Sequence, residues 1–267
     1  MEKLDEIPLP VLVEGEQKNK TVFEQKDRNG AYEIKGYYDF DAMTERDHKM
    51  IRAAYHAMNA LIDRQVGRLL DSLEQNGELE NTLIIYTSDH GEMLGDHGIY
   101  LKGPYFYDPV VRVPLIIAWP SVLPAGVECN ELVELVDLPE TLLDACCIPL
   151  HAGMQGKSLW PLLNNRANAP HRKNVYCEYY NANLNHRDPP AYLTMLSDGK
   201  RKLIKVHDKT GKAGCAGMLY DLEKDPGEHH NVYNDPAYAE TKTRLLEDLC
   251  DRMAETCDPL PERRSSW

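Results

Sequence analysis

The sequence lacks any apolar run close to the roughly 18 residues needed to span a bilayer, and residues 1–6 lack the apolar core of an export signal. It has no CxxC pair among its seven cysteines, no internal repeat and no low-complexity tract. We therefore expect no membrane partner and no disulfide scaffold. Reduced thiols and the missing export signal slightly favour a cytoplasmic location.

Positive charge is also scarce, since 30 Lys and Arg residues face 43 Asp and Glu residues, for a formal net charge of −13. A field of this sign repels nucleic acid, so we expect no nucleic-acid partner. An anionic substrate would need local positive charge from a metal ion or a few basic side chains. The length of 267 residues is sufficient for a substantial buried core.

The pattern along the chain predicts three parts. Residues 1–43 are polar with no sustained period, and we expect an extended, linker-like segment. Residues 44–168 predict the α/β part. They open with a capping-box-like start at Thr44 and a long amphipathic helix that ends at Asn76-Gly77.

Two short runs of β-forming residues follow, at 82–87 and 113–119. Their continuous apolar character favours central strands covered on both faces, and we expect them to be neighbours in a largely parallel sheet. A further helix is predicted over residues 132–147.

Residues 169–267 predict a small α+β part. The strand candidates are residues 175–180, 192–196, 202–206 and 219–222, and a helix over residues 238–253 is expected to cover an antiparallel sheet.

The polar sequence Ser88-Asp89-His90-Gly91 comes directly after the first predicted strand. In open α/β sheets ligands bind beyond the carboxyl ends of strands. A carboxylate and an imidazole at such a point suit a divalent cation. The alternative is that Ser88 and Asp89 cap the next turn and His90 is a surface residue.

Two further residues are candidates for this site. Lys102 lies in the loop that returns from the first strand, where a lysine could stabilise an anionic group beside the metal. The alternative is a solvated loop lysine. His97 is either a catalytic residue that contacts substrate or a buried histidine that holds the loop, and the second role is favoured.

Taken together, the motifs resemble the sulfatase family of the alkaline phosphatase superfamily. The resemblance covers roughly residues 45–232. The segments that carry it are residues 55–73, 87–98, 102–103, 111–116, 136–144, 156–159 and 219–228. It implies a fold in which the C-terminal part of an alkaline-phosphatase-like α/β sandwich is followed by a small antiparallel sheet with a C-terminal helix.

The resemblance also implies roles for residues. Asp89 and His90 match two ligands of a single active-site cation, with calcium favoured and magnesium or manganese as alternatives. Lys102 matches a lysine that contacts the sulfate group. The implied substrate is a sulfate ester, either a small molecule or a sulfated glycan. Many sulfatases have Asn at the position of His90, and the Asp-His form is similar to relatives that include phosphonate monoester and choline-ester hydrolases.

Two family features are missing from this sequence. One is an early pair of aspartate ligands, and the other is the Cys/Ser-x-Pro/Ala-x-Arg motif whose first residue becomes the formylglycine nucleophile. We therefore expect an incomplete sulfuric-ester hydrolase that is inactive alone. Its partner would be a missing N-terminal half, with a homo-oligomer as the other possibility. The competing hypotheses are a phosphonate or phosphodiester hydrolase of the same superfamily and a non-catalytic remnant.

Overall fold

The computed structural model describes residues 4–28, 30, 38–164, 171–181 and 186–257. Its helices are α1 (Val22–Arg28), α2 (Glu45–Gln75), α3 (Asp108–Val111), α4 (Asp137–Ala145), α5 (Trp160–Leu163) and α6 (Ala239–Glu255). The strands are β1 (Ile84–Thr87), β2 (Leu115–Ala118), β3 (Val175–Tyr180), β4 (Tyr192–Ser197), β5 (Arg201–Val206) and β6 (Gly217–Asp221). Short 3-10 turns are η1 (Leu4–Glu6), η2 (Glu16–Asn19), η4 (Phe40–Ala42), η5 (Leu79–Asn81), η6 (Asp96–Gly98) and η7 (Pro236–Tyr238).

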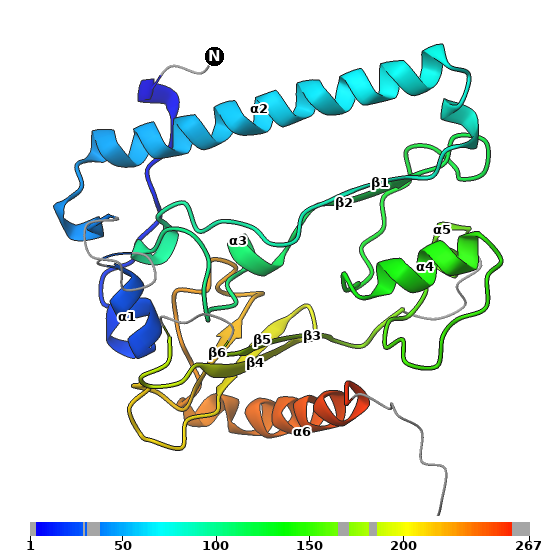
Figure 1. The fold of residues 1–267 in the computed structure, drawn as a ribbon. Helices are drawn as coiled ribbons and strands as arrows, with labels where there is room; N and C mark the ends of the chain where they lie inside the picture. Colours follow the sequence, from blue (N-terminus) through cyan, green and yellow to red (C-terminus); the bar gives the residue numbers. More distant parts are fainter. Residues whose placement is uncertain (1–3, 29, 31–37, 165–170, 182–185, 258–267) are drawn as a thin grey trace, which may run out of the picture.

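A four-stranded antiparallel sheet in the order β3-β4-β5-β6 forms the centre of the lower half of Figure 1. Side chains alternate between its two faces, as the period of two in a strand requires. Leu196, Leu203 and Leu219 point to one face, where they pack on Leu245 and Leu249 of α6. The predicted C-terminal antiparallel sheet with its covering helix is confirmed.

The opposite face of this sheet supports the loop between β1 and β2. Met195, Ile204 and Met218 point to this face, and Met93 and Tyr107 of the loop pack in the same core cluster. All five side chains are almost fully buried. The loop that contains Lys102 therefore rests on a rigid β-sheet platform.

The long helix α2 starts and ends where the sequence predicts. Thr44 forms a capping box with Asp47, in which the Thr44 hydroxyl accepts from Asp47 N and Asp47 Oδ2 accepts from Thr44 N at 2.8 Å. Gly77, with φ of 71°, follows the C-terminus. The apolar stripe of the helix remains largely exposed, however. Its exposed members are Met50, Ile51, Met58, Leu61, Ile62 and Leu69.

Strands β1 and β2 are neighbours, as expected, but the prediction of a parallel pair is wrong. They pair antiparallel as a separate two-stranded ribbon, with Tyr86 opposite Ile116. These two side chains are 40% and 60% exposed, so the ribbon is not covered on both faces in the described chain. In Figure 1 the ribbon runs below α2, away from the four-stranded sheet.

The expected extended course of residues 1–43 is wrong for Val22–Arg28, which forms α1. The hydropathy pattern hides this helix because it buries charged groups, Glu24 and Asp27. Glu24 Oε1 accepts from the Tyr107 hydroxyl at 2.6 Å, and the carboxylate of Asp27 lies 3.1 Å from His186 Nε2. Buried charges of this kind persist only when paired.

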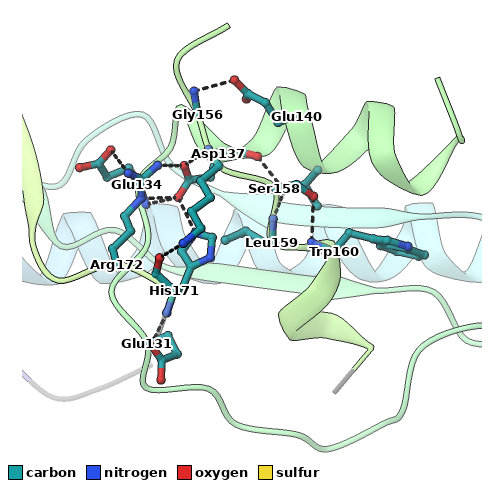
Figure 2. Close-up of polar contacts among 12 residues, drawn as sticks. Glu131, Glu134, Asp137, Glu140, Gly156, Ser158, Leu159, Trp160, His171 and Arg172 are labelled. Atoms are coloured by element: carbon teal, nitrogen blue, oxygen red, sulfur yellow. Dashed lines mark hydrogen bonds and ion pairs between the residues drawn. The ribbon is translucent and has the colours of Figure 1, made fainter. Parts of the chain in front are cut away.

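Helix α4 is joined to the start of β3 by a buried polar network, drawn in Figure 2. Asp137 in the first turn of α4 accepts from Arg172 Nε at 3.1 Å, and His171 Nε2 lies 3.3 Å from the same carboxylate. Glu134 Oε1 accepts from Tyr176 N at 2.7 Å. The helix predicted over residues 132–147 is therefore shorter. Residues 132–136 form a loop instead, and the Glu134 carboxylate in this loop binds Arg172 and the start of β3.

Three further features concern the helices, the cysteines and the domain boundary. No helix of the described residues is long and apolar enough to cross a membrane. The seven cysteines all lie in described residues and are free thiols. The predicted domain boundary at 168/169 lies outside the described residues, and the three-part division stays a prediction.

Candidate active site at the end of β1

Asp89 and His90 lie just beyond the last residue of β1. The ribbon closes at this end through the Thr87 hydroxyl, which donates to Pro114 O at 2.8 Å. The Ser88 hydroxyl donates to His90 O at 2.7 Å and holds the following turn. Asp89 is strongly exposed and His90 is partly exposed, with side-chain values of 86% and 44%. Both groups are therefore open to a ligand or to another chain segment.

The imidazole of His90 is oriented by the backbone of the next residue, Gly91. Its Nδ1 lies 2.8 Å from Gly91 O, and a carbonyl oxygen can only accept, so Nδ1 carries the proton. In the neutral ring Nε2 then presents a lone pair, 3.7 Å from Asp89 Oδ2. Asp89 Oδ1 accepts from His90 N at 3.0 Å, which leaves Oδ2 towards the imidazole. One nitrogen atom and one oxygen atom, both of types that bind divalent cations, thus face each other.

Gly91 is required because the backbone of α3 approaches it closely. A Cβ at this position would lie 1.9 Å from Pro109 O. Gly91 N donates to Val110 O at 2.7 Å, and Glu92 N donates to Pro109 O at 3.0 Å. This contact fixes the chain immediately after the Asp89-His90 pair.

Lys102 is brought next to the same segment through its neighbour Leu101. Leu101 N donates to Glu92 Oε1 at 2.5 Å, and Leu101 O accepts from Met93 N at 3.1 Å. Leu101 adopts φ of 65°, a left-handed conformation that is rare for a branched residue. The half-buried Lys102 therefore follows a residue that is held against Glu92 and Met93, the two residues after Gly91.

His97 belongs to a different group of side chains. It is 2% exposed, and its ring stacks on Tyr107 with 3.9 Å between ring centroids. Its Nδ1 lies 3.4 Å from Glu16 Oε2, and its ring centroid is 4.7 Å from that of His229. Burial lowers the pKa of His97 and favours the neutral ring.

Glu16 and His229 are the residues that sequence reasoning missed. Burial alone would raise the pKa of the Glu16 carboxyl, but the neighbouring His97 imidazole and the Lys20 ammonium lower it to about 2. Glu16, His97 and His229 come from three distant segments, and no spacing rule joins them. Only tertiary folding brings them together.

Comparison with known families assigns this α/β chain to a class of enzymes. Residues 16–147 match the family described as Sulfatase, and residues 95–255 match the family described as N-sulphoglucosamine sulphohydrolase, C-terminal. The chain belongs to the sulfatase family, type I, of the alkaline phosphatase superfamily.

Individual relatives support this assignment. The N-acetylglucosamine-6-O-sulfatase of Bacteroides thetaiotaomicron is 33% identical over 214 residues, which cover 79% of this chain and 37% of that protein. The phosphonate monoester hydrolase of Silicibacter pomeroyi superposes with a TM-score of 0.83 at 26% identity, over 97% of this chain and 52% of that chain. A protein solved in complex with its substrate D-glucosamine-2-N,6-O-disulfate gives a TM-score of 0.68 at 30% identity, over 83% of this chain and 42% of that chain. The chain thus spans between about a third and a half of the length of these relatives.

Proposed function

We propose that this chain supplies part of the active site of a sulfuric-ester hydrolase. Asp89 and His90 hold one divalent cation, and Lys102 contacts the sulfate group of the substrate. The observation that carries the proposal is the orientation of His90, whose Nδ1 contact with Gly91 O directs Nε2 towards Asp89 Oδ2. Sulfatase family membership supports the same assignment.

Calcium is the proposed cation, with magnesium and manganese as alternatives. When bound, the cation neutralises sulfate oxygens and lowers the pKa of a nucleophile at the site. Asp89 and His90 supply two donors, where oxygen-preferring cations usually take about six or more ligands. The other ligands come from water and from residues outside this chain, so the affinity of the chain alone is modest.

Lys102 and His97 receive different roles. Lys102 places a positive charge on the substrate oxygens, and the bonds of Leu101 to Glu92 and Met93 fix its backbone. His97 is too deeply buried to contact substrate in this structure. We assign it to the support of the loop.

The nucleophile is proposed to come from an N-terminal α/β portion that packs on this chain. That portion contributes the formylglycine residue, and it covers the apolar stripe of α2 together with Tyr86 and Ile116 on the ribbon. The share of the solved relative that this chain spans, 52%, leaves room for such a portion. Large exposed apolar patches of this kind mark interaction surfaces. A second copy of this chain is the competing occupant.

A sulfated sugar is the proposed substrate class. The relative solved with D-glucosamine-2-N,6-O-disulfate and the N-acetylglucosamine-6-O-sulfatase both support it. A phosphonate monoester is the second candidate, because the phosphonate monoester hydrolase superposes over 97% of this chain. Sulfate esters and phosphonate monoesters are both tetrahedral anions with delocalised charge, so the same cation and lysine suit both.

The test is hydrolysis of 4-nitrophenyl sulfate and of a 4-nitrophenyl phosphonate monoester. The chain is assayed alone and mixed with the N-terminal portion of an intact sulfatase that carries a matured formylglycine. We expect turnover only in the mixture, with the sulfate ester preferred, because a positioned nucleophile contributes about 7–11 kcal/mol to lowering the barrier. Preference for the phosphonate would favour the second candidate. Robust turnover by the chain alone would contradict the proposal.

A further inference from the structure

Glu16, His97 and His229 form a compact group of donor atoms in the described part of the chain. Glu16 Oε2 lies 2.6 Å from His229 Nδ1 and 3.4 Å from His97 Nδ1. The three ligand atoms all lie within 4.8 Å of one another. Glu16 and His229 are 213 residues apart in the sequence, so the group joins the N-terminal segment to the turn after β6.

Two atoms of this group are buried and have no hydrogen-bond partner. They are Glu16 Oε1 and His97 Nδ1. The side chains of Glu16 and His97 are only 2% and 3% exposed. An unsatisfied buried donor or acceptor is costly, and most such groups in folded proteins are satisfied by protein, water or an ion. Glu16 Oε1 faces Lys20 Nζ at 3.7 Å, whereas His97 Nδ1 faces Glu16 Oε2, the atom that also lies next to His229. The unsatisfied His97 Nδ1 therefore points to a ligand between the two imidazoles and Glu16 Oε2.

The surrounding charge favours a cation. Glu16 and Glu24 are buried carboxylates, and Lys20 is the buried cation beside them, with its Nζ 3.7 Å from Glu16 Oε1. Lys20 Nζ donates to His97 O at 2.8 Å, which gives it a partner besides Glu16. Arg28 also acts on the charge of Lys20, but its guanidinium is paired with Asp41 at 2.6 Å. Glu16, Glu24 and Asp41 thus set three negative charges against the two positive charges of Lys20 and Arg28, and the group is short of positive charge.

We propose that Glu16, His97 and His229 bind a zinc-like divalent transition cation. Two imidazole nitrogens and one carboxylate oxygen are typical zinc donors, with a fourth position open to water. The cation takes the place of the Nδ1 proton of His229. Tyr107, stacked on His97, holds that ring in place.

The proposed role of this site is structural. A cation here would connect η2, the loop at η6 and the turn after β6, and so brace the loop that leads to Lys102. The site is separate from the Asp89-His90 pair and does not depend on the proposed hydrolase function.

The experiment uses Zn²⁺ and Co²⁺ alone as probes of the full chain. Thiols are first alkylated, because the exposed neighbours Cys146 and Cys147 could also bind zinc. Zinc uptake is measured by calorimetry, and cobalt binding by its visible absorption. The variants are Glu16→Gln and His229→Gln. His230→Gln is the matched control, since His230 is the next residue but its side chain is 71% exposed.

We expect about one equivalent of zinc in the wild-type chain and in His230→Gln. Affinity should fall at least about 100-fold in Glu16→Gln and His229→Gln, because removal of a ligand should cost at least as much as loss of an outer-shell partner. Zinc should raise the melting temperature of the wild type but not of His229→Gln. Asp89→Ala should keep zinc uptake, which separates this site from the proposed active site.

Circular dichroism shows whether each variant is folded. Unchanged zinc uptake in folded Glu16→Gln and His229→Gln would overturn the proposal. The absence of zinc uptake by the folded wild type would also overturn the proposal. Glu16, His97 and His229 would then be a hydrogen-bonded cluster that binds no metal.

Discussion

Arg172 and Asp137 form a buried ion pair that joins the start of β3 to the first turn of α4. Arg172 Nε donates to Asp137 Oδ2 at 3.1 Å, and the two side chains are 8% and 0% exposed. Glu134 is a second carboxylate partner, 3.4 Å from Arg172 Nη1. The pair therefore fixes α4 relative to the four-stranded sheet (Figure 2).

Replacing Asp137 by Asn should destabilise the chain by about 3 kcal/mol, at the lower end of the range for a broken buried pair, because Glu134 still faces Arg172. Urea unfolding measures this loss. The matched control is Lys212→Ala, whose pair with Asp188 is 62% and 85% exposed and should contribute about 0–1 kcal/mol. An equal effect of the two substitutions would show that burial does not govern the Asp137 pair.

The same carboxyl predicts a loss of stability in acid. Burial alone would raise the pKa of Asp137, but hydrogen bonds from Arg172 and from the N–H groups of Glu134 and Lys157 hold it below its ordinary value of 3.8. A carboxyl with a lowered folded pKa stabilises the protein above the unfolded pKa, and this is lost as pH falls through the folded pKa. Burial also lowers the pKa of His171, so protonation of this ring as the pH falls destabilises the folded chain as well.

Unfolding free energies should therefore be measured from pH 7 down to about 3. Below about pH 4, where free aspartates become protonated, the wild type should lose stability more steeply than Asp137→Asn. Parallel curves over that window would contradict the assigned shift.

Gly91→Ala should disturb the candidate site, because its Cβ would meet Pro109 O at 1.9 Å. The backbone must move, at a cost of about 1–3 kcal/mol as for other overpacked positions. The matched control is Gly67→Ala on α2, where a Cβ meets nothing within 4 Å and helix propensity should add about 1 kcal/mol of stability. Urea unfolding of both variants checks the prediction, and stabilisation by Gly91→Ala would contradict it.

Thiol reactivity should divide the cysteines into two groups. Burial raises the pKa of Cys177 and Cys215 to about 11, whereas the other five thiols are exposed. The thiolate is the reactive form, so at pH 8 these two half-buried thiols should react with iodoacetamide on the order of 100-fold more slowly than the exposed thiols. Peptide mass spectrometry after a short pulse measures this. Labelling of Cys177 as fast as Cys250 would contradict the packing of β3.

Local patterns in the sequence were sufficient for much of the fold. The bounds of β3 were predicted as residues 175–180, and the capping box at Thr44 was recognised, because both depend on residues close in sequence. The direction of β2 was not predictable from its own apolar run, since strand direction depends on the path of the intervening loop. Helix α1 was missed because Glu24 and Asp27 are buried through partners far away in the sequence.

The candidate site shows the same division. Asp89, His90 and Lys102 lie within one strand-loop unit, and the resemblance to the sulfatase family suggested their roles, which stay a prediction. The Glu16, His97 and His229 group unites segments from both ends of the chain, and no local signal marks it. The amphipathic pattern predicted the helix α2 but not what covers its apolar stripe, and that stripe is largely exposed in the described chain.

The central claim is that Asp89, His90 and Lys102 act in sulfate-ester hydrolysis. Its most direct test is the turnover number for 4-nitrophenyl sulfate, with calcium, of the chain mixed with a formylglycine-bearing N-terminal portion. Asp89→Ala, His90→Ala and Lys102→Ala should each lower it by about 10²–10³-fold, the usual effect of removing one electrostatic contact to the transition state. Lys209→Ala, at an exposed loop lysine, should leave it unchanged. Turnover in the Asp89→Ala mixture equal to that of the wild type would contradict the account.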